Sequence, residues 1–196
     1  MKIGILGSSF NPAHAGHLKL SLKAIEIFNL DEVWWLITKQ NPLKNKSEYL
    51  PFDLRVKKVE NLITNEIIKL KIFEDSTESI FLIDNLKFIK KNYTNETFIF
   101  LMGGDSFCEM DQWRDYENIF KLMPIAVFKR NEEKYQPLAS VAAKTFDKFK
   151  KKSGIGSAIF EDIPAWTFID DFNAEESSTM IPVSYTHLTL PTNREV

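Results

Sequence analysis

Short apolar segments alternate with longer stretches of helical periodicity along most of the chain, and this alternation narrows the possible folds more than any other feature. The apolar segments are rich in β-branched and aromatic residues, as buried strands are. The alternation predicts an α/β fold with a doubly wound, mainly parallel sheet, whose ligands bind beyond the carboxyl ends of the strands. The predicted strands are residues 2–6, 32–38, 67–73, 97–102, 124–128 and 165–170.

Two of the stretches between these strands show an apolar face at helical spacing. Residues 147–157, a basic run followed by small residues, are instead interpreted as a solvated helix end and loop. The expected apolar faces consist of Leu18, Leu22, Ile25 and Phe28 in the first helix and of Ile80, Ile83, Leu86 and Ile89 in the second.

A chain of 196 residues can bury one sizeable α/β core but is short for two domains. Its formal net charge of -2 does not favour nucleic acid as a partner. The single cysteine, Cys108, excludes an internal disulfide framework and a thiolate metal site, and fits a reducing compartment. No membrane-length apolar run or signal-peptide pattern is present, so we expect a cytoplasmic protein without a membrane partner. The sequence does not indicate an oligomeric state.

Residues 183–196, VSYTHLTLPTNREV, differ in composition from the rest of the chain, which is rich in Lys, Asn and Ile. They resemble one translated frame of the transposon-end adapter used in preparing sequencing libraries. We therefore expect a single, C-terminally truncated domain over residues 1–182 and a non-native tail over 183–196. The tail contains His187, one of the 3 histidines.

The stretch GSSFNPAHAGH, residues 7–17, joins the first predicted strand to a helix expected to begin near Gly16 or His17. Small residues in such a turn let backbone N–H groups approach a phosphate at the positive end of the helix. His14 and His17 are close enough in sequence to contact the same anion. From the residues alone, the pair could also be half of a metal site or two capping or core histidines. Neither a Walker motif nor G-x-G-x-x-G is present.

This stretch closely resembles the signature G-G-S-F-D/N-P-x-H-x-G-H of the nucleotidyltransferase superfamily, whose members transfer a nucleotide from a nucleoside triphosphate and release pyrophosphate. The resemblance implies a Rossmann-like nucleotidyltransferase fold. It also implies that His14 and His17 are catalytic. Ser8 stands where the signature has its second glycine. The substrate-binding residues implied by the turn are Gly7, Ser8, Ser9 and Phe10.

Three later segments, residues 34–44, 98–120 and 173–181, resemble the bacterial nicotinate-nucleotide adenylyltransferases, which join nicotinate mononucleotide to ATP in NAD synthesis. Together with the turn, the resemblance extends over nearly the whole chain up to residue 181. The substrate-binding residues implied by these segments are Lys44, Gly104, Asp105, Trp113, Ser178 and Thr179.

The residue types allow other interpretations at several of these positions. The Trp113 indole follows a polar turn, where it can stack on a pyridine ring. Asp105 could be a helix cap as well as a substrate contact, and Ser178 and Thr179 could simply begin a helix. Other prominent side chains are expected to be structural: Trp34 and Trp35 in the core, and Arg55 and Arg130 as surface charges.

The chain departs from the pattern of the adenylyltransferases in two places. Phe81 and Leu82 stand where these enzymes usually have a Tyr-Thr pair, so a hydroxyl contact to the nicotinate side is expected to be missing. Pro182 stands where they have an arginine, so this chain lacks a cation expected to bind phosphate and is expected to be impaired.

The implied reaction needs no protein nucleophile, because the phosphate of the mononucleotide supplies its own anionic oxygen. His14 and His17 are expected to donate hydrogen bonds to the ATP phosphates, and Lys44 to add positive charge. Mg²⁺ is expected to arrive with ATP, held by phosphate oxygens and water rather than by a protein metal site. The alternatives are an adenylyltransferase acting on pantetheine phosphate or nicotinamide mononucleotide, and a nucleotide-binding module without turnover. The middle segments favour nicotinate.

Overall fold

A computed structural model describes residues 1–39, 43, 49–129 and 135–172. Within these residues the strands form one sheet of 7 strands in the order β3-β2-β1-β4-β5-β7-β6, and each neighbouring pair is parallel. The predicted doubly wound sheet and its six predicted strands are confirmed. The strands are β1 (Lys2–Ser8), β2 (Glu32–Ile37), β3 (Ile68–Lys71), β4 (Thr97–Gly103), β5 (Ile125–Phe128), β6 (Lys150–Lys151) and β7 (Trp166–Ile169).

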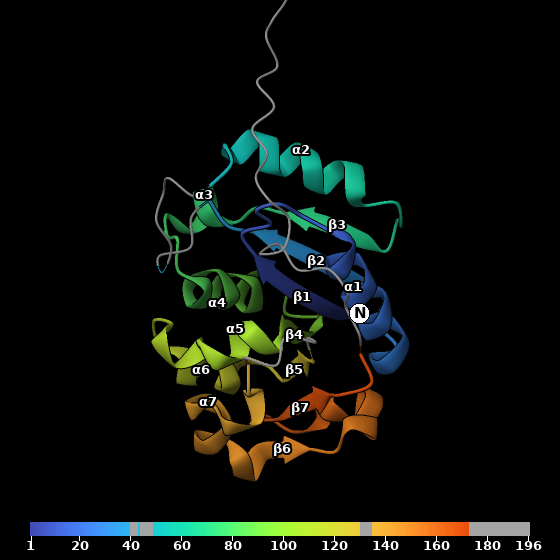
Figure 1. The fold of residues 1–196 in the computed structure, drawn as a ribbon, viewed down its shortest axis with the longest axis vertical. Coiled ribbons are helices and arrows are strands. Elements are labelled where there is room, and N and C mark those ends of the chain that lie inside the picture. The colour runs from blue at the N-terminus through green and yellow to red at the C-terminus, as the bar shows by residue number, and fades with distance from the viewer. Residues whose placement is uncertain (40–42, 44–48, 130–134, 173–196) are drawn as a thin grey trace, which may run out of the picture.

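Helices cover both faces of this sheet (Figure 1). The α-helices are α1 (Ala15–Phe28), α2 (Phe52–Leu62), α3 (Glu74–Thr77), α4 (Leu82–Asn92), α5 (Gly104–Cys108), α6 (Tyr116–Leu122) and α7 (Val141–Thr145). The 3₁₀ helices are η2 (Met110–Gln112), η3 (Pro137–Ala139), η4 (Asp147–Phe149) and η5 (Ser153–Glu161). The helices α4 to α7 pack on one face, and α1, α2 and η5 pack on the other.

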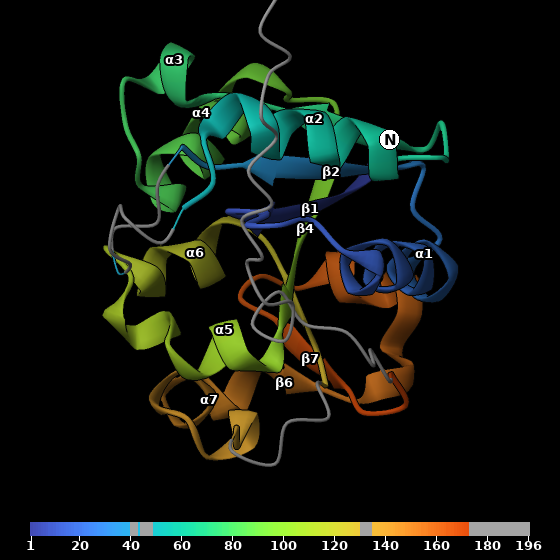
Figure 2. The same cartoon turned by 45° about the horizontal axis from the view of Figure 1, so that its top comes forward.

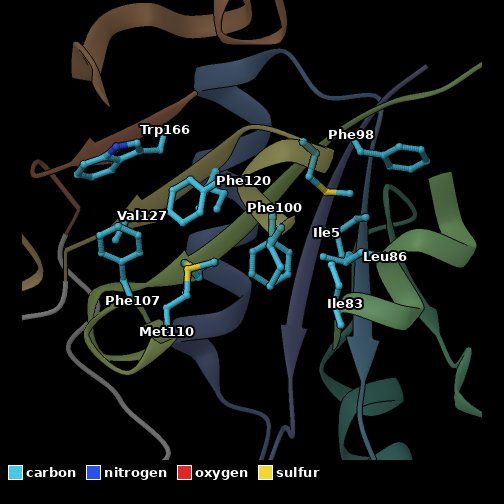
Figure 3. Close-up of a cluster of buried hydrophobic side chains, with 14 of the residues drawn as sticks. Ile5, Ile83, Leu86, Phe98, Phe100, Phe107, Met110, Phe120, Val127 and Trp166 are labelled. Atoms are coloured by element: carbon cyan, nitrogen blue, oxygen red, sulfur yellow. The ribbon is translucent and has the colours of Figure 1, made fainter. Parts of the chain in front are cut away.

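The core consists of two apolar layers, one on each face of the sheet, because successive side chains of a strand point to opposite faces. Ile5 belongs to the layer beneath α4 to α7, together with Ile83, Leu86 and Phe120 (Figure 3). The next residue, Leu6, belongs to the other layer. The two predicted core tryptophans, Trp34 and Trp35, are both buried and lie in opposite layers.

The predicted apolar face of α1 is partly confirmed, since Phe28 is buried and Leu18 and Ile25 pack partly buried against the core, but Leu22 does not belong to it. Leu22 is 42% exposed, whereas Leu20, Ala24 and Phe28 are buried. The buried face also contains small or polar residues that an apolar pattern does not count. Ser21, for example, is buried because its hydroxyl accepts a hydrogen bond from the Trp35 indole and donates one to the carbonyl of residue 17.

The predicted face of α4 is largely confirmed, because Ile83, Leu86 and Ile89 are buried. Ile80 is the exception: it precedes the helix and is exposed. Residues 147–157 are solvent-accessible, as predicted, but they form η4, β6 and the first part of η5 rather than a helix end and a loop. Lys150 pairs with Trp166 at the edge of the sheet, where charged side chains are tolerated because one side of the strand faces solvent.

The strand order determines which segments meet at the carboxyl edge of the sheet. β1 lies between β2 and β4, so the carboxyl ends of all three strands lie at one edge of the sheet (Figure 2). The turn after β1 holds the two histidines, and α5 follows β4 directly. Ligands of parallel sheets bind at this edge. No helix within the described residues has the length and apolar character needed to cross a membrane.

Candidate functional site

The two histidines of the turn cap the helix that follows it. His14 is the N-cap of α1, and its Nδ1 accepts a hydrogen bond of 3.1 Å from the backbone N–H of Gly16. The Nδ1 of His17 accepts one of 3.3 Å from the backbone N–H of His14. The pair therefore forms a reciprocal capping box, a motif that Ser or Thr with Glu or Gln usually makes.

This capping fixes where each imidazole carries its proton. A ring nitrogen that accepts a hydrogen bond carries no proton, so each neutral ring is protonated at Nε2. The rings are both 4% exposed and their centroids lie 4.0 Å apart. The Nε2 atom of His17 lies 3.5 Å from the Ser8 hydroxyl. The turn thus places two Nε2–H donors beside each other at the positive end of a helix, a suitable arrangement for an anion.

Ser8, the residue that departs from the signature, stabilises the turn. Its hydroxyl accepts a hydrogen bond of 3.2 Å from the backbone N–H of Phe10. The Phe10 ring is fully buried and stacks on Trp35 at 4.9 Å with an angle of 15° between the rings. Phe10 thus supports the turn from the core, and only its backbone remains for the predicted contact with substrate.

Arg55 is not the surface charge that the sequence indicated. Its side chain in α2 is 1% exposed, and its guanidinium donates only to backbone carbonyls among the described residues. These carbonyls come from three segments: the turn of residues 7–17, called the histidine turn below, the residues that follow β2, and the segment before α2. The acceptors are Ser9 (2.5 Å), Thr38 (2.8 Å), Lys39 (2.6 Å) and Leu50 (3.1 Å).

Two aromatic rings and one buried carboxylate lie near Arg55, beside the turn. The guanidinium lies 5.2 Å from the ring centroids of both Tyr49 and Phe52. Burial lowers the pKa of Arg55, while the nearby Tyr49 and Glu74 act in the opposite direction. Glu74 is itself buried and accepts a hydrogen bond of 2.9 Å from the backbone N–H of Lys39. Burial raises the pKa of Glu74, opposed by this hydrogen bond and by the charges of Lys39 and Arg55.

A cavity of about 260 Å³ adjoins the turn at the carboxyl edge of the sheet. A side chain at Gly7 would be crowded here, since a Cβ atom would lie 3.2 Å from the Phe100 ring. Trp113 packs edge-on against that ring at 6.4 Å. Four of the predicted site residues, Gly7, Ser8, Ser9 and Trp113, thus share one cavity. The described residues that line it are Gly7, Ser8, Ser9, Thr38, Leu43, Ile80, Phe81, Leu82, Gln112, Trp113 and Arg114.

Other predicted site residues, including His14, His17 and Phe10, lie outside this lining. Gly104 and Asp105 begin α5 at the same edge of the sheet, and Asp105 is in the first turn of that helix rather than at its N-cap. Gly104 has a structural reason to be glycine, because a Cβ atom would lie 2.6 Å from the Pro137 ring. The predictions for Lys44, Ser178, Thr179, Pro182, Arg130 and the segment 183–196 lie outside the described residues.

The sequence interpretation missed several residues that line the cavity, among them Thr38, Gln112 and Arg114. Thr38 could have been found, since it follows the strand next to β1 and so lies at the same sheet edge. Gln112 and Arg114 flank the predicted Trp113, but nothing in the sequence shows which of the three point into a cavity. Within the described residues, no group of three or more His, Cys, Asp or Glu side chains is placed to hold a metal ion.

The fold and this site together define a nucleotidyltransferase-like protein, and comparisons with known proteins place it more closely. The model of the cytidylyltransferase-like family matches residues 5–182. A probable nicotinate-nucleotide adenylyltransferase of Methylorubrum extorquens is 35% identical over 182 residues, which cover 92% of this chain and 98% of the relative. A probable nicotinate-nucleotide adenylyltransferase of Mesorhizobium japonicum is 34% identical over 182 residues, which cover 92% of this chain and 93% of the relative.

A solved structure supports the fold independently. The nicotinic acid mononucleotide adenylyltransferase of Plasmodium falciparum, complexed with NaAD, superposes with a TM-score of 0.65 at 21% identity, covering 91% of this chain and 80% of that one. The chain therefore belongs to the cytidylyltransferase-like family and, within it, to the family of the nicotinate-nucleotide adenylyltransferases.

Proposed function

We propose that this protein transfers the adenylyl group of ATP to nicotinate mononucleotide, giving nicotinate adenine dinucleotide and pyrophosphate. One observation carries the proposal beyond family membership: a single cavity is lined both by Gly7, Ser8 and Ser9 of the turn after β1 and by Trp113. Phosphates suit one part of that cavity and an aromatic ring suits the other. An acceptor that is both a phosphate and a pyridine fits these two parts.

The chemistry follows from the substrates. An oxygen of the mononucleotide 5′-phosphate forms a bond to the α-phosphorus of ATP. The bond from that phosphorus to the bridging oxygen breaks, and pyrophosphate leaves with the electron pair. We assign the Nε2–H groups of His14 and His17 to the ATP phosphates, where they stabilise the negative charge that shifts to the leaving group. Because both Nδ1 atoms are held by backbone N–H groups, these donors need little reorganisation.

The remaining roles are assigned by position. Gly7, Ser8 and Ser9 contact phosphates through the turn, and Trp113 stacks on the pyridine ring. Asp105, in the first turn of α5, contacts the second nucleotide. Phe10 is proposed to contact the substrate through its backbone only, because its ring is buried. The other proposed contacts, made by Gly104, Lys44, Ser178 and Thr179, rest on the family resemblance.

Mg²⁺ is proposed to arrive as part of the ATP substrate. The described lining of the cavity contains hydroxyl, amide and backbone groups but no carboxylate. Mg²⁺ prefers oxygen ligands and readily keeps several water molecules. Phosphate oxygens and water therefore suit this site better as ligands than protein side chains do.

The test is pyrophosphate release from MgATP with one acceptor at a time. Nicotinate mononucleotide, nicotinamide mononucleotide and pantetheine phosphate should be compared at equal concentration. The proposal predicts the highest kcat/KM with nicotinate mononucleotide. With pantetheine phosphate it predicts no pyrophosphate release above background. Preferred turnover of either other acceptor would assign a different transferase activity. ATP binding without turnover of any acceptor would indicate a binding module.

A further inference from the structure

Arg114 is the one charged side chain among the described residues that line the cavity. It directly follows Trp113, and its side chain is 58% exposed. The other lining side chains are apolar, hydroxyl or amide groups, apart from the indole. A ligand in this cavity therefore meets one full positive charge, placed beside the aromatic ring.

The Arg114 guanidinium is held by stacking rather than by hydrogen bonds. Its central carbon lies 4.5 Å from the centroid of the Phe81 ring, which also lines the cavity. Phe81 precedes α4, whereas Arg114 lies between η2 and α6. The guanidinium thus lies over a ring from a separate segment, and this contact does not occupy its N–H groups.

The nearby carboxylates hold Arg114 weakly. Asp84 lies 3.9 Å from Nη1, and the same oxygen, Oδ2, accepts a hydrogen bond of 2.7 Å from the Ser79 hydroxyl. Asp115, the next residue along the chain, pairs instead with Lys87 at 3.3 Å. Because exposed ion pairs contribute little, a ligand carboxylate can replace Asp84 as the partner of Arg114 at small cost. In the described part of the chain the guanidinium makes no hydrogen bond, so its donors are open to such a ligand.

We propose that Arg114 is a specificity-determining residue that recognises the carboxylate of the pyridine ring, so that the protein prefers nicotinate over nicotinamide mononucleotide. This inference rests on the proposed function and deepens it. The two mononucleotides differ only in a carboxylate against a neutral amide. A guanidinium can bind a carboxylate through two parallel N–H···O bonds, and an amide offers one neutral oxygen. The Phe81 ring, 4.5 Å from the central carbon of the guanidinium, restricts the positions that the guanidinium can take.

The experiment measures the dissociation constants of both mononucleotides by calorimetry, and separately their turnover with MgATP. The parental protein is compared with Arg114→Gln, which removes the charge, and with Arg114→Lys, which keeps the charge but loses the planar fork. Lys87→Gln is the matched control, because it removes an exposed positive charge near the same helices and outside the cavity lining.

Arg114→Gln should lower the preference for nicotinate about tenfold, by weakening nicotinate binding and leaving nicotinamide binding nearly unchanged. Arg114→Lys should keep part of the preference, and Lys87→Gln all of it. Equal weakening of both mononucleotides would overturn the inference and place Arg114 on a group they share, such as the phosphate. An unchanged preference would also overturn it.

Binding and turnover separate this inference from the proposed function. If the parental protein binds nicotinate mononucleotide preferentially but transfers nothing to it, and Arg114→Gln loses the binding preference, the proposed reaction is wrong and the role of Arg114 stands. If it turns over nicotinate mononucleotide and Arg114→Gln keeps the preference, the reaction stands and the role of Arg114 is wrong. A parental protein that binds neither mononucleotide contradicts both.

Discussion

The buried guanidinium of Arg55 donates a hydrogen bond of 2.5 Å from Nη1 to the carbonyl oxygen of Ser9. This contact ties α2 to the histidine turn, although the two residues are 46 positions apart in the sequence. The same nitrogen also donates to the carbonyl of Thr38, at the end of β2. Two backbone segments that line the cavity therefore depend on one side chain for their relative position.

Arg55→Met should lower the free energy of unfolding by at least about 2 kcal/mol, because it leaves several buried carbonyls without their donor. It should also lower kcat/KM for the transfer about a hundredfold in the folded protein, since small displacements of a positioning group cost that much. In both stability and kcat/KM, Arg55→Lys should fall between the parental protein and Arg55→Met. Urea unfolding and steady-state kinetics check both effects. Lys57→Met, an exposed change on the same helix, is the control. Equal effects of both changes would contradict the proposed role of Arg55.

The capping role of His17 makes its catalytic role testable without losing the helix cap. Asparagine places an acceptor where Nδ1 stands but lacks a group at Nε2, whereas glutamine places an amide N–H near Nε2. His17→Asn should therefore fold almost as well as the parental protein but lose about 10²- to 10³-fold in kcat. His17→Gln should keep more activity despite a weaker cap. Thermal unfolding and pyrophosphate release measure the two effects. If His17→Asn were the more active variant, the assignment of Nε2 would be wrong.

Trp113→Ala should weaken binding of nicotinate mononucleotide by roughly 1–3 kcal/mol, the contribution of one stacked ring. Binding of ATP should change little, and Trp113→Phe should restore most of the mononucleotide affinity. Calorimetric titration with each ligand tests this. An equal loss for both ligands would show that the indole acts through its packing on Phe100 rather than by stacking on the substrate.

The stability of the parental protein relative to a Glu74→Gln variant should be greater in acid than at higher pH. Burial raises the pKa of the Glu74 carboxyl, so the folded state holds this proton more tightly than the unfolded state does. The free energy of unfolding must then fall as pH rises from the unfolded to the folded pKa of this group. The difference between parental protein and variant, measured by urea unfolding across a pH series, should fall over that interval and then level off. A difference that rises with pH would mean that Arg55 and Lys39 outweigh burial and depress this pKa.

The strand pattern and the signature were enough to predict the sheet and the turn. Both are local in sequence: strands such as 97–102 are continuous apolar runs, and residues 7–17 form one uninterrupted motif. The full buried face of α1 was not predictable from hydropathy, because Ser21 is buried through its hydrogen bonds. The edge strand β6 was missed for a similar reason, since its two lysines pair through their backbone alone.

The missed parts of the site depend on contacts between distant segments. Arg55 is separated in sequence from every strand end it joins, and arginines are usually exposed, so the sequence favoured a surface charge. Its burial depends on carbonyls supplied by the turn and by β2. Arg114 lines the cavity with its guanidinium over the ring of Phe81, which comes from a separate segment.

The most direct test of the central claim follows the α-phosphorus of ATP. The protein is incubated with Mg²⁺, nicotinate mononucleotide and ATP labelled at that phosphorus, and the products are separated. Adenylyl transfer predicts that the label enters the dinucleotide in amounts equal to the unlabelled pyrophosphate released, and only when the mononucleotide is present. Release of the label as free AMP, or pyrophosphate formation that does not depend on the mononucleotide, would contradict the account.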